Sequence, residues 1–328
     1  MQGGNKKMDQ FIQYTPTEVV FGKETENQAG AEVKKWGGTK VLVVYGGGSA
    51  KRSGLLDRVE ASLAKEGLAF EELGGVKPNP RLALAEEGVK KAVEMQADFI
   101  LAVGGGSSID TAKAVAHGAA NPEEALWDIW TKKVPLTKSL PVGAVLTIPA
   151  AGSEMSDSAV LTNEAIGKKA GINTPFNRCK FAIMNPELAA TLPKYQIACG
   201  VTDIMMHTME RYFSNTEHTE LLDRMSEGLL KTVMANTKKA LAEPNDYDER
   251  AHVGGQPFPQ QSYGRRQGAG LGDAQDRARA WRHVRRGARR RSRRRVGQLG
   301  AVCDARQSPP LHALCRGGHG LRDELREP

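Results

Sequence analysis

The first 190 residues alternate between short, continuous apolar runs and stretches whose apolar residues recur every three or four positions. Runs at residues 41–45, 99–103 and 142–148 predict buried strands, and Phe70 opens a weaker one. Strands that are apolar on both faces and alternate with amphipathic helices indicate a parallel sheet covered on both sides.

Three helices are predicted between these strands from the spacing of their apolar side chains. The residues expected to be buried are Leu55, Val59 and Leu63 in the first helix, Leu84, Val89 and Val93 in the second, and Ile109, Ala112, Val115 and Ala116 in the third.

After Pro193 the pattern becomes helical, and we expect helices at residues 196–213 and 219–241. The sequence therefore predicts an α/β nucleotide-binding domain over residues 1–190, followed by the start of an all-helical domain over residues 191–252.

Residues 253–328 depart from this pattern. They contain 17 arginines and six acidic residues but no Lys, Ile, Met, Asn or Thr. Of the chain's 46 basic and 38 acidic residues, 29 and 32 remain before position 253, so that part carries a net charge of −3. The overall charge of +8 thus comes from the tail, which we expect to be disordered.

The cysteine pattern and the apolar runs bear on the compartment. No two of the four cysteines (Cys179, Cys199, Cys303 and Cys315) are closely spaced, which is typical of free thiols in a reducing compartment. No apolar run has the length of a signal peptide core or of a membrane span. We expect a cytoplasmic protein with no membrane partner.

Two predicted strands end in a glycine triplet followed by serine, at residues 46–49 and 104–107, and a helix follows each. Glycine lets the backbone approach a ligand, and a helix N-terminus attracts phosphate. Two such loops favour nucleotide binding, although neither fits Gly-x-Gly-x-x-Gly. The alternative is a pair of tight turns, with Ser107 and Asp110 forming a capping box.

Lys51 and Arg52 follow the first glycine loop. A carboxylate at such a position would bind the ribose diol of NAD, whereas a basic residue suits the 2′-phosphate of NADP. The pair therefore leans towards NADP, and the alternative is that both side chains are simply solvated.

Asp203 and His207 lie four positions apart in a predicted helix and so share one face. A carboxylate and an imidazole suit a borderline divalent cation such as iron or zinc. A surface ion pair is the alternative, since a catalytic metal ordinarily has at least three protein ligands.

Residues 9–252 resemble the iron-containing alcohol dehydrogenase family, especially its butanol dehydrogenase-like branch. The matching stretches are Tyr-Gly-Gly-Gly-Ser at 45–49, Asn-Pro-Arg at 79–81, Gly-Gly-Gly-Ser-Ser-Ile-Asp at 104–110 with Lys113, Thr-Ile-Pro-Ala-Ala-Gly-Ser-Glu at 147–154, and residues 200–212.

The resemblance implies a dehydroquinate-synthase-like fold and hydride transfer between NADP or NAD and a primary alcohol or aldehyde, such as butanol and butyraldehyde. It implies a metal, Fe²⁺ or Zn²⁺, that acts as a Lewis acid on the substrate oxygen. Two of the four metal ligands in the family match Asp203 and His207. The positions that match cofactor contacts are Gly47, Ser49, Asn79, Gly105, Gly106, Ser107, Asp110, Thr147 and Lys169.

The chain departs from the family pattern after His252. The family's other two ligands are histidines, in a His-Glu-Leu segment and a later Asp-x-x-His-Gly segment, and neither is present. We therefore expect a truncated helical domain and a chain that lacks metal-dependent activity as written.

The composition of residues 253–328 indicates GC-rich coding sequence translated in the wrong frame. Taking the last two bases of each codon with the first base of the next, residues 273–286 are compatible with Thr-His-Lys-Ile-Glu-His-Glu-Leu-Gly-Gly-Met-Phe-Asp. Further along, another histidine codon, followed by Gly, can straddle Ala288 and Arg289. Both missing histidine segments are thus recovered in order, which predicts a frameshift just after His252.

Other classes of protein stay open. A non-catalytic nucleotide-binding protein needs only the glycine loops, and a nucleic-acid-binding protein could use the arginines of residues 285–295, with binding that falls steeply with salt. A glycerol dehydrogenase-like or dehydroquinate synthase-like enzyme is the alternative within the fold. We expect no specific nucleic-acid partner. The oligomeric state stays open: the resemblance allows a homodimer, in which a strand near residues 11–21 could pair across the interface.

The frameshift can be tested by sequencing the source DNA across the codons for residues 249–271. We expect one or two bases to be added or lost there, so that the corrected frame encodes both histidine segments. A frame that stands as written would contradict the frameshift and leave a chain that at most binds the nucleotide.

Overall fold

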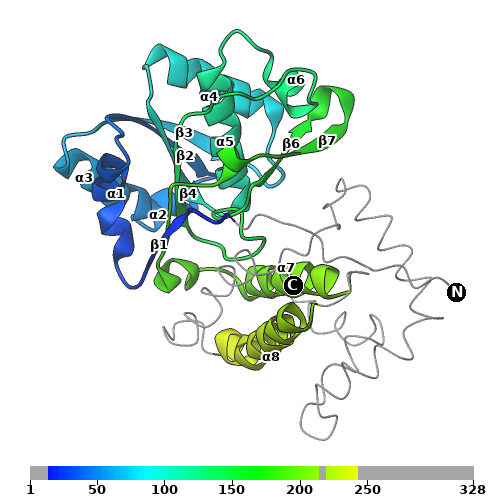
Figure 1. Ribbon diagram of the computed structural model, residues 1–328. Coiled ribbons are helices and arrows are strands. Elements are labelled where there is room, and N and C mark those ends of the chain that lie inside the picture. Colours follow the sequence, from blue (N-terminus) through cyan, green and yellow to red (C-terminus); the bar gives the residue numbers. More distant parts are fainter. Residues whose placement is uncertain (1–13, 214–218, 243–328) are drawn as a thin grey trace, which may run out of the picture. The chain divides into compact units, whose positions relative to one another are not determined.

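The computed structural model describes residues 14–213 and 219–242 (Figure 1). Six strands form one parallel sheet in the order β1-β8-β5-β4-β2-β3. They are β1 (Glu18–Phe21), β2 (Lys40–Gly46), β3 (Ala69–Val76), β4 (Phe99–Gly104), β5 (Val142–Leu146) and β8 (Phe181–Met184). The strands predicted from continuous apolar runs are confirmed as β2, β4 and β5, and the weaker one as β3.

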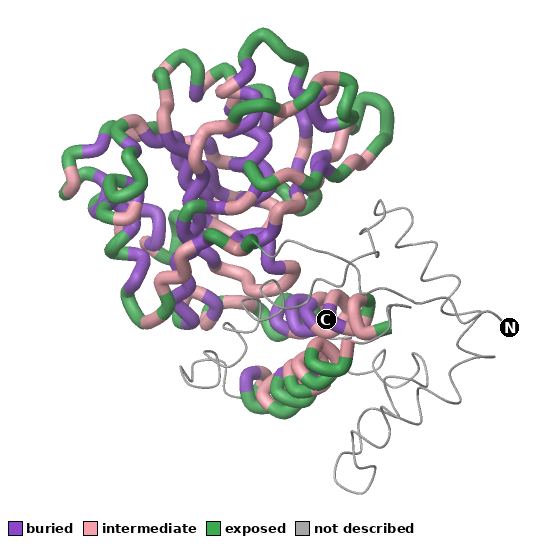
Figure 2. Tube along the Cα trace, viewed as in Figure 1, coloured by how far each residue is buried: buried purple, intermediate pink, exposed green. Residues whose placement is uncertain are grey.

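Helices cover both faces of this sheet. They are α1 (Ala29–Lys35), α2 (Ser49–Arg52), α3 (Leu55–Lys65), α4 (Leu82–Glu94) and α5 (Gly106–Ala120). A further short helix, α6 (Leu126–Trp130), packs against α4 and α5. Successive strand residues point to opposite faces, so Val41 and Val43 pack with α1 and α3, whereas Leu42 and Val44 pack with α4 and α5. Figure 2 shows the buried residues concentrated in this layered region.

One predicted helix face is displaced from the observed one. In α4 the residues expected in the core are Leu84, Val89 and Val93, but the first two are half-buried and Val93 is exposed. The buried residues of this helix are Leu82, Ala85, Gly88 and Ala92. Small residues face the sheet because α4 packs closely there: a Cβ on Gly88 would lie 2.5 Å from side-chain atoms of Leu73 and Val115.

The structure contains three strands that the sequence did not predict. The short strand β8 and the antiparallel hairpin of β6 (Ser158–Asn163) and β7 (Lys168–Asn173) were not anticipated from the sequence. The strand expected near residues 11–21 is present as β1, and it pairs in parallel with β8 of its own sheet. It is the end strand of the sheet, so its second edge pairs with no other strand among the described residues, and pairing across a dimer interface stays a prediction.

Two long helices, α7 (Lys194–Tyr212) and α8 (Glu220–Ala242), follow the last strand. They pack through a small apolar cluster that includes Ile197, Val201, Ile204 and Val233. The described residues contain no strand after Met184, which agrees with an α/β part followed by helices. The boundary at residue 190 stays a prediction.

Several expectations lie outside the described residues: the disorder of the tail, the arginine-rich stretch, the histidines beyond position 213, and Cys303 and Cys315. Cys179 and Cys199 are free thiols. Within the part of the chain that the structure describes, no helix is long and apolar enough to cross a membrane.

The contact between α1 and α3 gives a stability prediction. A Cβ on Gly30 would lie 2.1 Å from the backbone oxygen of Ser62, and the Gly30 amide donates to Ser62 Oγ at 2.9 Å. We expect Gly30→Ala to lower the free energy of unfolding by about 1–3 kcal/mol, as overpacking usually does. Chemical denaturation would measure it.

The matched control is Gly228→Ala in α8, where an added Cβ meets no atom within 4 Å. Both substitutions gain the same helix propensity, so Gly228→Ala should be neutral or stabilising by up to about 1 kcal/mol. Equal effects of the two variants would show that the α1–α3 contact is looser than described.

Candidate cofactor site and metal ligands

The predicted cofactor residues gather at one edge of the sheet. Strands β5, β4 and β2 are parallel neighbours, so their carboxyl ends lie together, as ligand-binding edges of such sheets do. Their ends carry the loops that contain Gly47, Gly105 and Thr147. The Thr147 amide donates to the Gly104 carbonyl at 3.1 Å, which ties two of these loops together.

Backbone geometry explains the glycines of the second loop. Gly104 has a φ of +154°, and a Cβ there would meet the Ser108 side chain at 2.4 Å. A Cβ on Gly105 would lie 3.2 Å from Ile148. Gly105 is the N-cap of α5 and supplies no side-chain hydrogen bond. Its carbonyl accepts from the Ser108 and Ile109 amides, so the Gly106 and Ser107 amides are the ones without an acceptor in the described structure. This arrangement suits an anionic ligand.

The capping-box alternative for Ser107 and Asp110 is wrong. Ser107 lies inside α5, and its carbonyl accepts a hydrogen bond from Thr111 Oγ1 at 2.8 Å. Asp110 accepts instead from Ser153 Oγ and, at 3.0 Å, from the Val160 amide. Its carboxylate therefore holds the segment after β5, and burial raises its pKa above the usual value.

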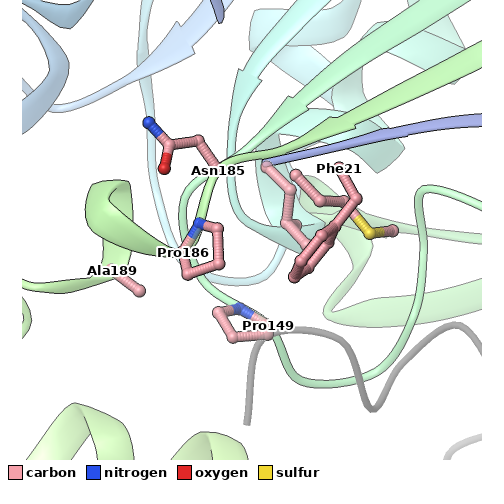
Figure 3. Close-up of a pocket in the computed structure, with 7 residues that line it drawn as sticks. Phe21, Pro149, Asn185, Pro186 and Ala189 are labelled. Atoms are coloured by element: carbon pink, nitrogen blue, oxygen red, sulfur yellow. The ribbon is translucent and has the colours of Figure 1, made fainter. Parts of the chain in front are cut away.

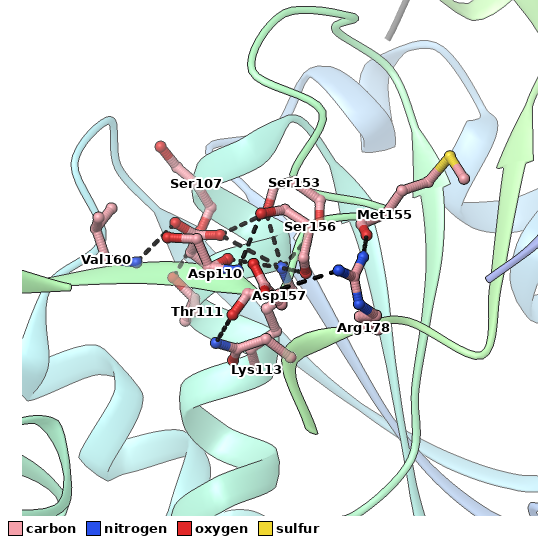
Figure 4. Close-up of polar contacts among 12 residues, drawn as sticks. Ser107, Asp110, Thr111, Lys113, Ser153, Met155, Ser156, Asp157, Val160 and Arg178 are labelled. Atoms are coloured by element: carbon pink, nitrogen blue, oxygen red, sulfur yellow. Dashed lines mark hydrogen bonds and ion pairs between the residues drawn. The ribbon is translucent and has the colours of Figure 1, made fainter. Parts of the chain in front are cut away.

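A buried cation lies beside Asp110. The Lys113 side chain is fully buried and its Nζ contacts the Ser153 carbonyl at 2.7 Å, the Ser156 carbonyl at 3.2 Å and the Ser158 carbonyl at 3.1 Å (Figure 4). The carboxylate of Asp110 is 4.0 Å away. A neutralised and hydrogen-bonded cation of this kind is a stable arrangement in a protein interior.

Asn79 and Lys169 are 90 positions apart in the sequence, and the structure brings them together. Lys169 Nζ donates to Asn79 Oδ1 at 2.9 Å, from the exposed edge of the β6–β7 hairpin. Asn79 has a φ of +61°, a left-handed conformation that asparagine tolerates better than most residues. Two residues matched to cofactor contacts through the resemblance therefore form one polar pair.

The expectation for Lys51 changes with the structure. Its Nζ forms an ion pair with Glu72 at 2.7 Å, and Tyr45 donates to the same carboxylate at 2.6 Å. The Glu72 and Tyr45 hydrogen bonds raise the pKa of Lys51. Lys51 is therefore not simply solvated, and its charge is already matched by Glu72, which weakens the case for NADP.

A small apolar pocket opens at the carboxyl ends of β1, β5 and β8 (Figure 3). Its lining residues are Phe21, Leu146, Pro149, Met184, Asn185, Pro186 and Ala189. Asn185 is fixed there, because its Nδ2 donates to Glu26 Oε2 at 2.9 Å and its Oδ1 accepts from the Glu187 amide. The pocket adds an apolar surface to the same edge of the sheet as the glycine loops.

The two predicted metal ligands lie on α7 with the expected spacing. His207 Nε2 is 3.6 Å from Asp203 Oδ1. Among the described residues, no group of three or more His, Cys, Asp or Glu side chains could hold a metal ion. This part of the chain thus contains two of the predicted ligands, and two ligands alone do not make a catalytic metal site.

His117 is a core residue. Burial lowers the pKa of its imidazole to about 4, so the ring is neutral near pH 7. Its ring nitrogens bond Ser139 Oγ and Asn177 Oδ1, both at 2.8 Å. The neutral ring therefore links α5 to the segments before β5 and β8.

Sequence reasoning missed the loop after β5 as a buried element. Residues 152–156 are all buried, although they form no helix or strand. Within it, Glu154 is 1% exposed and its Oε1 has no hydrogen-bond partner in the described structure. Arg178 supports the same loop by donating to the Met155 carbonyl at 2.7 Å. The Gly-Ser-Glu motif at 152–154 was the available clue.

Glu154 gives a pH prediction. Burial raises its pKa to about 7, whereas a carboxyl group in an unfolded chain titrates near 4.5. Between these values the folded protein holds a proton that the unfolded chain has lost, so this group's contribution to stability is full below pH 4.5 and is lost as pH rises through 7. Glu154→Gln should therefore gain stability over the native chain, by about 3 kcal/mol at pH 8.

Unfolding curves between pH 4.5 and 8 would measure this gain, which should shrink towards the acidic end. Glu87→Gln, on the exposed side of α4, is the control and should follow the native chain throughout. A Glu154→Gln curve parallel to the native one would mean that the carboxyl is hydrated in solution.

Comparisons with known proteins identify the family of the chain. A family model described as iron-containing alcohol dehydrogenase matches residues 16–186. A second family model, for the C-terminal part of the Fe-containing alcohol dehydrogenase family, matches residues 197–254. A probable NADH-dependent butanol dehydrogenase 2 of Bacillus subtilis is 44% identical over 246 residues, which is 75% of this chain and 63% of that protein. The NADPH-dependent aldehyde reductase of Escherichia coli is 38% identical over 250 residues, again 75% and 63%.

A solved structure supports the fold. The NADH-dependent butanol dehydrogenase A of Thermotoga maritima superposes with a TM-score of 0.74 at 39% identity, covering 79% of this chain and 66% of that one. The chain thus spans slightly less than two thirds of the relatives that it matches. These matches and the parallel sheet with its two glycine loops place the chain in the iron-containing alcohol dehydrogenase family.

Proposed function

We propose that the complete protein transfers a hydride between a nicotinamide dinucleotide and a primary alcohol or aldehyde, of the size of butanol and butyraldehyde. The observation that carries this proposal is the pair of glycine loops at the ends of neighbouring strands β2 and β4, with the uncapped N-terminus of α5 between β4 and the loop after β5. Relatives named as butanol dehydrogenases and an aldehyde reductase support the substrate class.

The described residues have definite tasks in this proposal. The backbone of Gly105, Gly106 and Ser107 would bind the cofactor pyrophosphate at the start of α5, where the N-cap residue Gly105 has no side chain to cap the helix amides. Gly47 and Ser49 would approach the cofactor from the first loop, where a Cβ on Gly47 would meet no atom within 4 Å. Asn79, Lys169 and Thr147 would supply further polar contacts, whereas Asp110 acts through Ser153.

Both NAD and NADP stay within the proposal. Lys51 is held by Glu72, which leaves Arg52 as the basic residue beside the first loop: its Nη1 is 3.2 Å from the place of a Cβ on Gly48. The relatives are named as NADH-dependent and NADPH-dependent enzymes. Arg52 alone is a weaker reason for NADP than two basic residues.

The metal site is incomplete in the described part of the chain. Asp203 and His207 are two ligands of a kind that suits Fe²⁺ or Zn²⁺, and two more are required by the family pattern. A bound metal would supply Lewis-acid polarisation of the substrate oxygen. The corrected reading frame proposed above restores two histidine segments, so we assign metal-dependent turnover to the corrected protein and nucleotide binding alone to the chain as written.

Cytoplasmic location and a homodimer belong to the same proposal. Free Cys179 and Cys199 suit a reducing compartment. A dimer is supported by the resemblance alone, and size-exclusion chromatography with light scattering would decide it.

The test compares the chain as written with its frame-corrected counterpart. The chain as written should bind NADH or NADPH in a fluorescence titration but should not reduce butyraldehyde in the presence of Fe²⁺ or Zn²⁺. The corrected protein should do both, because its metal site is complete. Stoichiometric metal binding and turnover by the chain as written would contradict the division of tasks.

A variant of the corrected protein provides the control. His207→Ala should abolish turnover while leaving the dissociation constant for NADH within about twofold, since the cofactor and metal sites use separate residues. A loss of cofactor binding in this variant would show that α7 also forms the nucleotide site.

A further inference from the structure

The loop of residues 147–158 contains buried backbone carbonyls that no helix or sheet pairs. It runs from the end of β5 to the start of β6, and its central residues 152–156 are buried without regular secondary structure. Buried backbone carbonyls must find donors, because an unpaired one costs free energy comparable to a lost hydrogen bond. Most loops avoid this cost by lying on the surface.

Two buried cationic side chains, Lys113 and Arg178, donate hydrogen bonds to carbonyls of this loop. Lys113 donates to the carbonyls of Ser153, Ser156 and Ser158, and Arg178 donates to that of Met155 (Figure 4). The Lys113 side chain has no exposed surface, and that of Arg178 is 8% exposed. The folded course of the loop is therefore set by where these two side chains place their charges.

The loop is also part of the candidate cofactor site. Thr147 bonds to Gly104, and Ile148 lies against Gly105 at the start of α5. Ser153 donates to Asp110, one turn further along the same helix. Any shift of the loop would therefore move the wall that faces the α5 N-terminus.

We infer that Lys113 is a positioning residue for the dinucleotide: its ammonium group folds residues 153–158 so that the loop and the start of α5 form one rigid cofactor cradle. This inference rests on the proposed function. Lys113 itself cannot contact the cofactor, because its Nζ is buried and its donors are taken by the loop. Its effect passes entirely through Ser153, Ser156 and Ser158.

The test uses the full chain and the variant Lys113→Met, which keeps the apolar stem and removes the ammonium group. We expect the dissociation constant for NADH or NADPH to rise by about tenfold or more, because small displacements of a binding wall have large effects on the bound geometry. Hydrogen exchange should accelerate in peptides covering residues 147–158. Circular dichroism should show that the variant retains its helices and strands.

The matched control is Ser62→Ala in α3, a buried side chain that also loses two hydrogen bonds. Its bonds join the Gly30 amide and the Asn27 carbonyl, neither of which belongs to the loop, so its loss of stability should leave cofactor affinity and loop exchange unchanged. Equal weakening of cofactor binding in both variants would overturn the inference in favour of general destabilisation.

A milder variant covers the case in which Lys113→Met does not fold. Ser153→Ala removes the link to Asp110 and one of the Lys113 acceptors, while the three carbonyl contacts remain. It should weaken cofactor binding by about threefold, with faster exchange in the same peptides. Native affinity in a folded Lys113→Met protein, or in Ser153→Ala when Lys113→Met does not fold, would overturn the inference.

The outcome separates this inference from the proposed function. If the native chain binds neither NADH nor NADPH, the proposed function fails. Loop exchange would then still report whether Lys113 orders residues 147–158, although its role in a cofactor site would fall with the function.

Discussion

The candidate site depends on one ammonium group in the protein interior. Lys113 belongs to a helix whose other buried residues are mostly apolar or small, and it points its charge at three backbone carbonyls of a loop that would otherwise carry unpaired polar groups. Asp110 balances part of this charge from one turn earlier. The helix thus has two tasks: its start faces the edge of the sheet that carries the glycine loops, and its first turns hold the neighbouring loop.

The sheet could be predicted largely from the sequence, because β-branched residues that are buried on both faces leave a continuous apolar run. The buried face of α4 could not, since the closest packing uses glycine and alanine, and the larger Val93 points to solvent. Strand β8 escaped prediction for a different reason. It has four residues, too few for a periodic pattern to separate it from a loop or a helix end.

Some features of the candidate site could likewise be predicted from the sequence, and others could not. Glycine loops can be recognised in a sequence because a positive φ or a close approach excludes other residues, as at Gly104. The support of the loop after β5 could not be recognised, because Lys113 contacts backbone oxygens, which every residue has. The pairing of Asn79 with Lys169 also depends on the folded hairpin, and sequence separation alone gives no reason for it. The four-residue spacing of Asp203 and His207 predicted that they share one helix face, but it could not identify the other two metal ligands.

The pairing of β1 with β8 also sets the order in which the α/β part can be completed during synthesis. Glu18–Phe21 finds its partner only when Phe181–Met184 has been made, so an early strand must wait for a distant one. Once Met184 has left the ribosome, every strand of the sheet is present, before residue 253 has been translated. The α/β part can therefore close around its core whatever follows His252, because domains generally fold as units from the N-terminal side. A change of reading frame at that point would be translated only after all strands of the sheet have been made. It would therefore alter the helices that follow and leave the sheet unchanged.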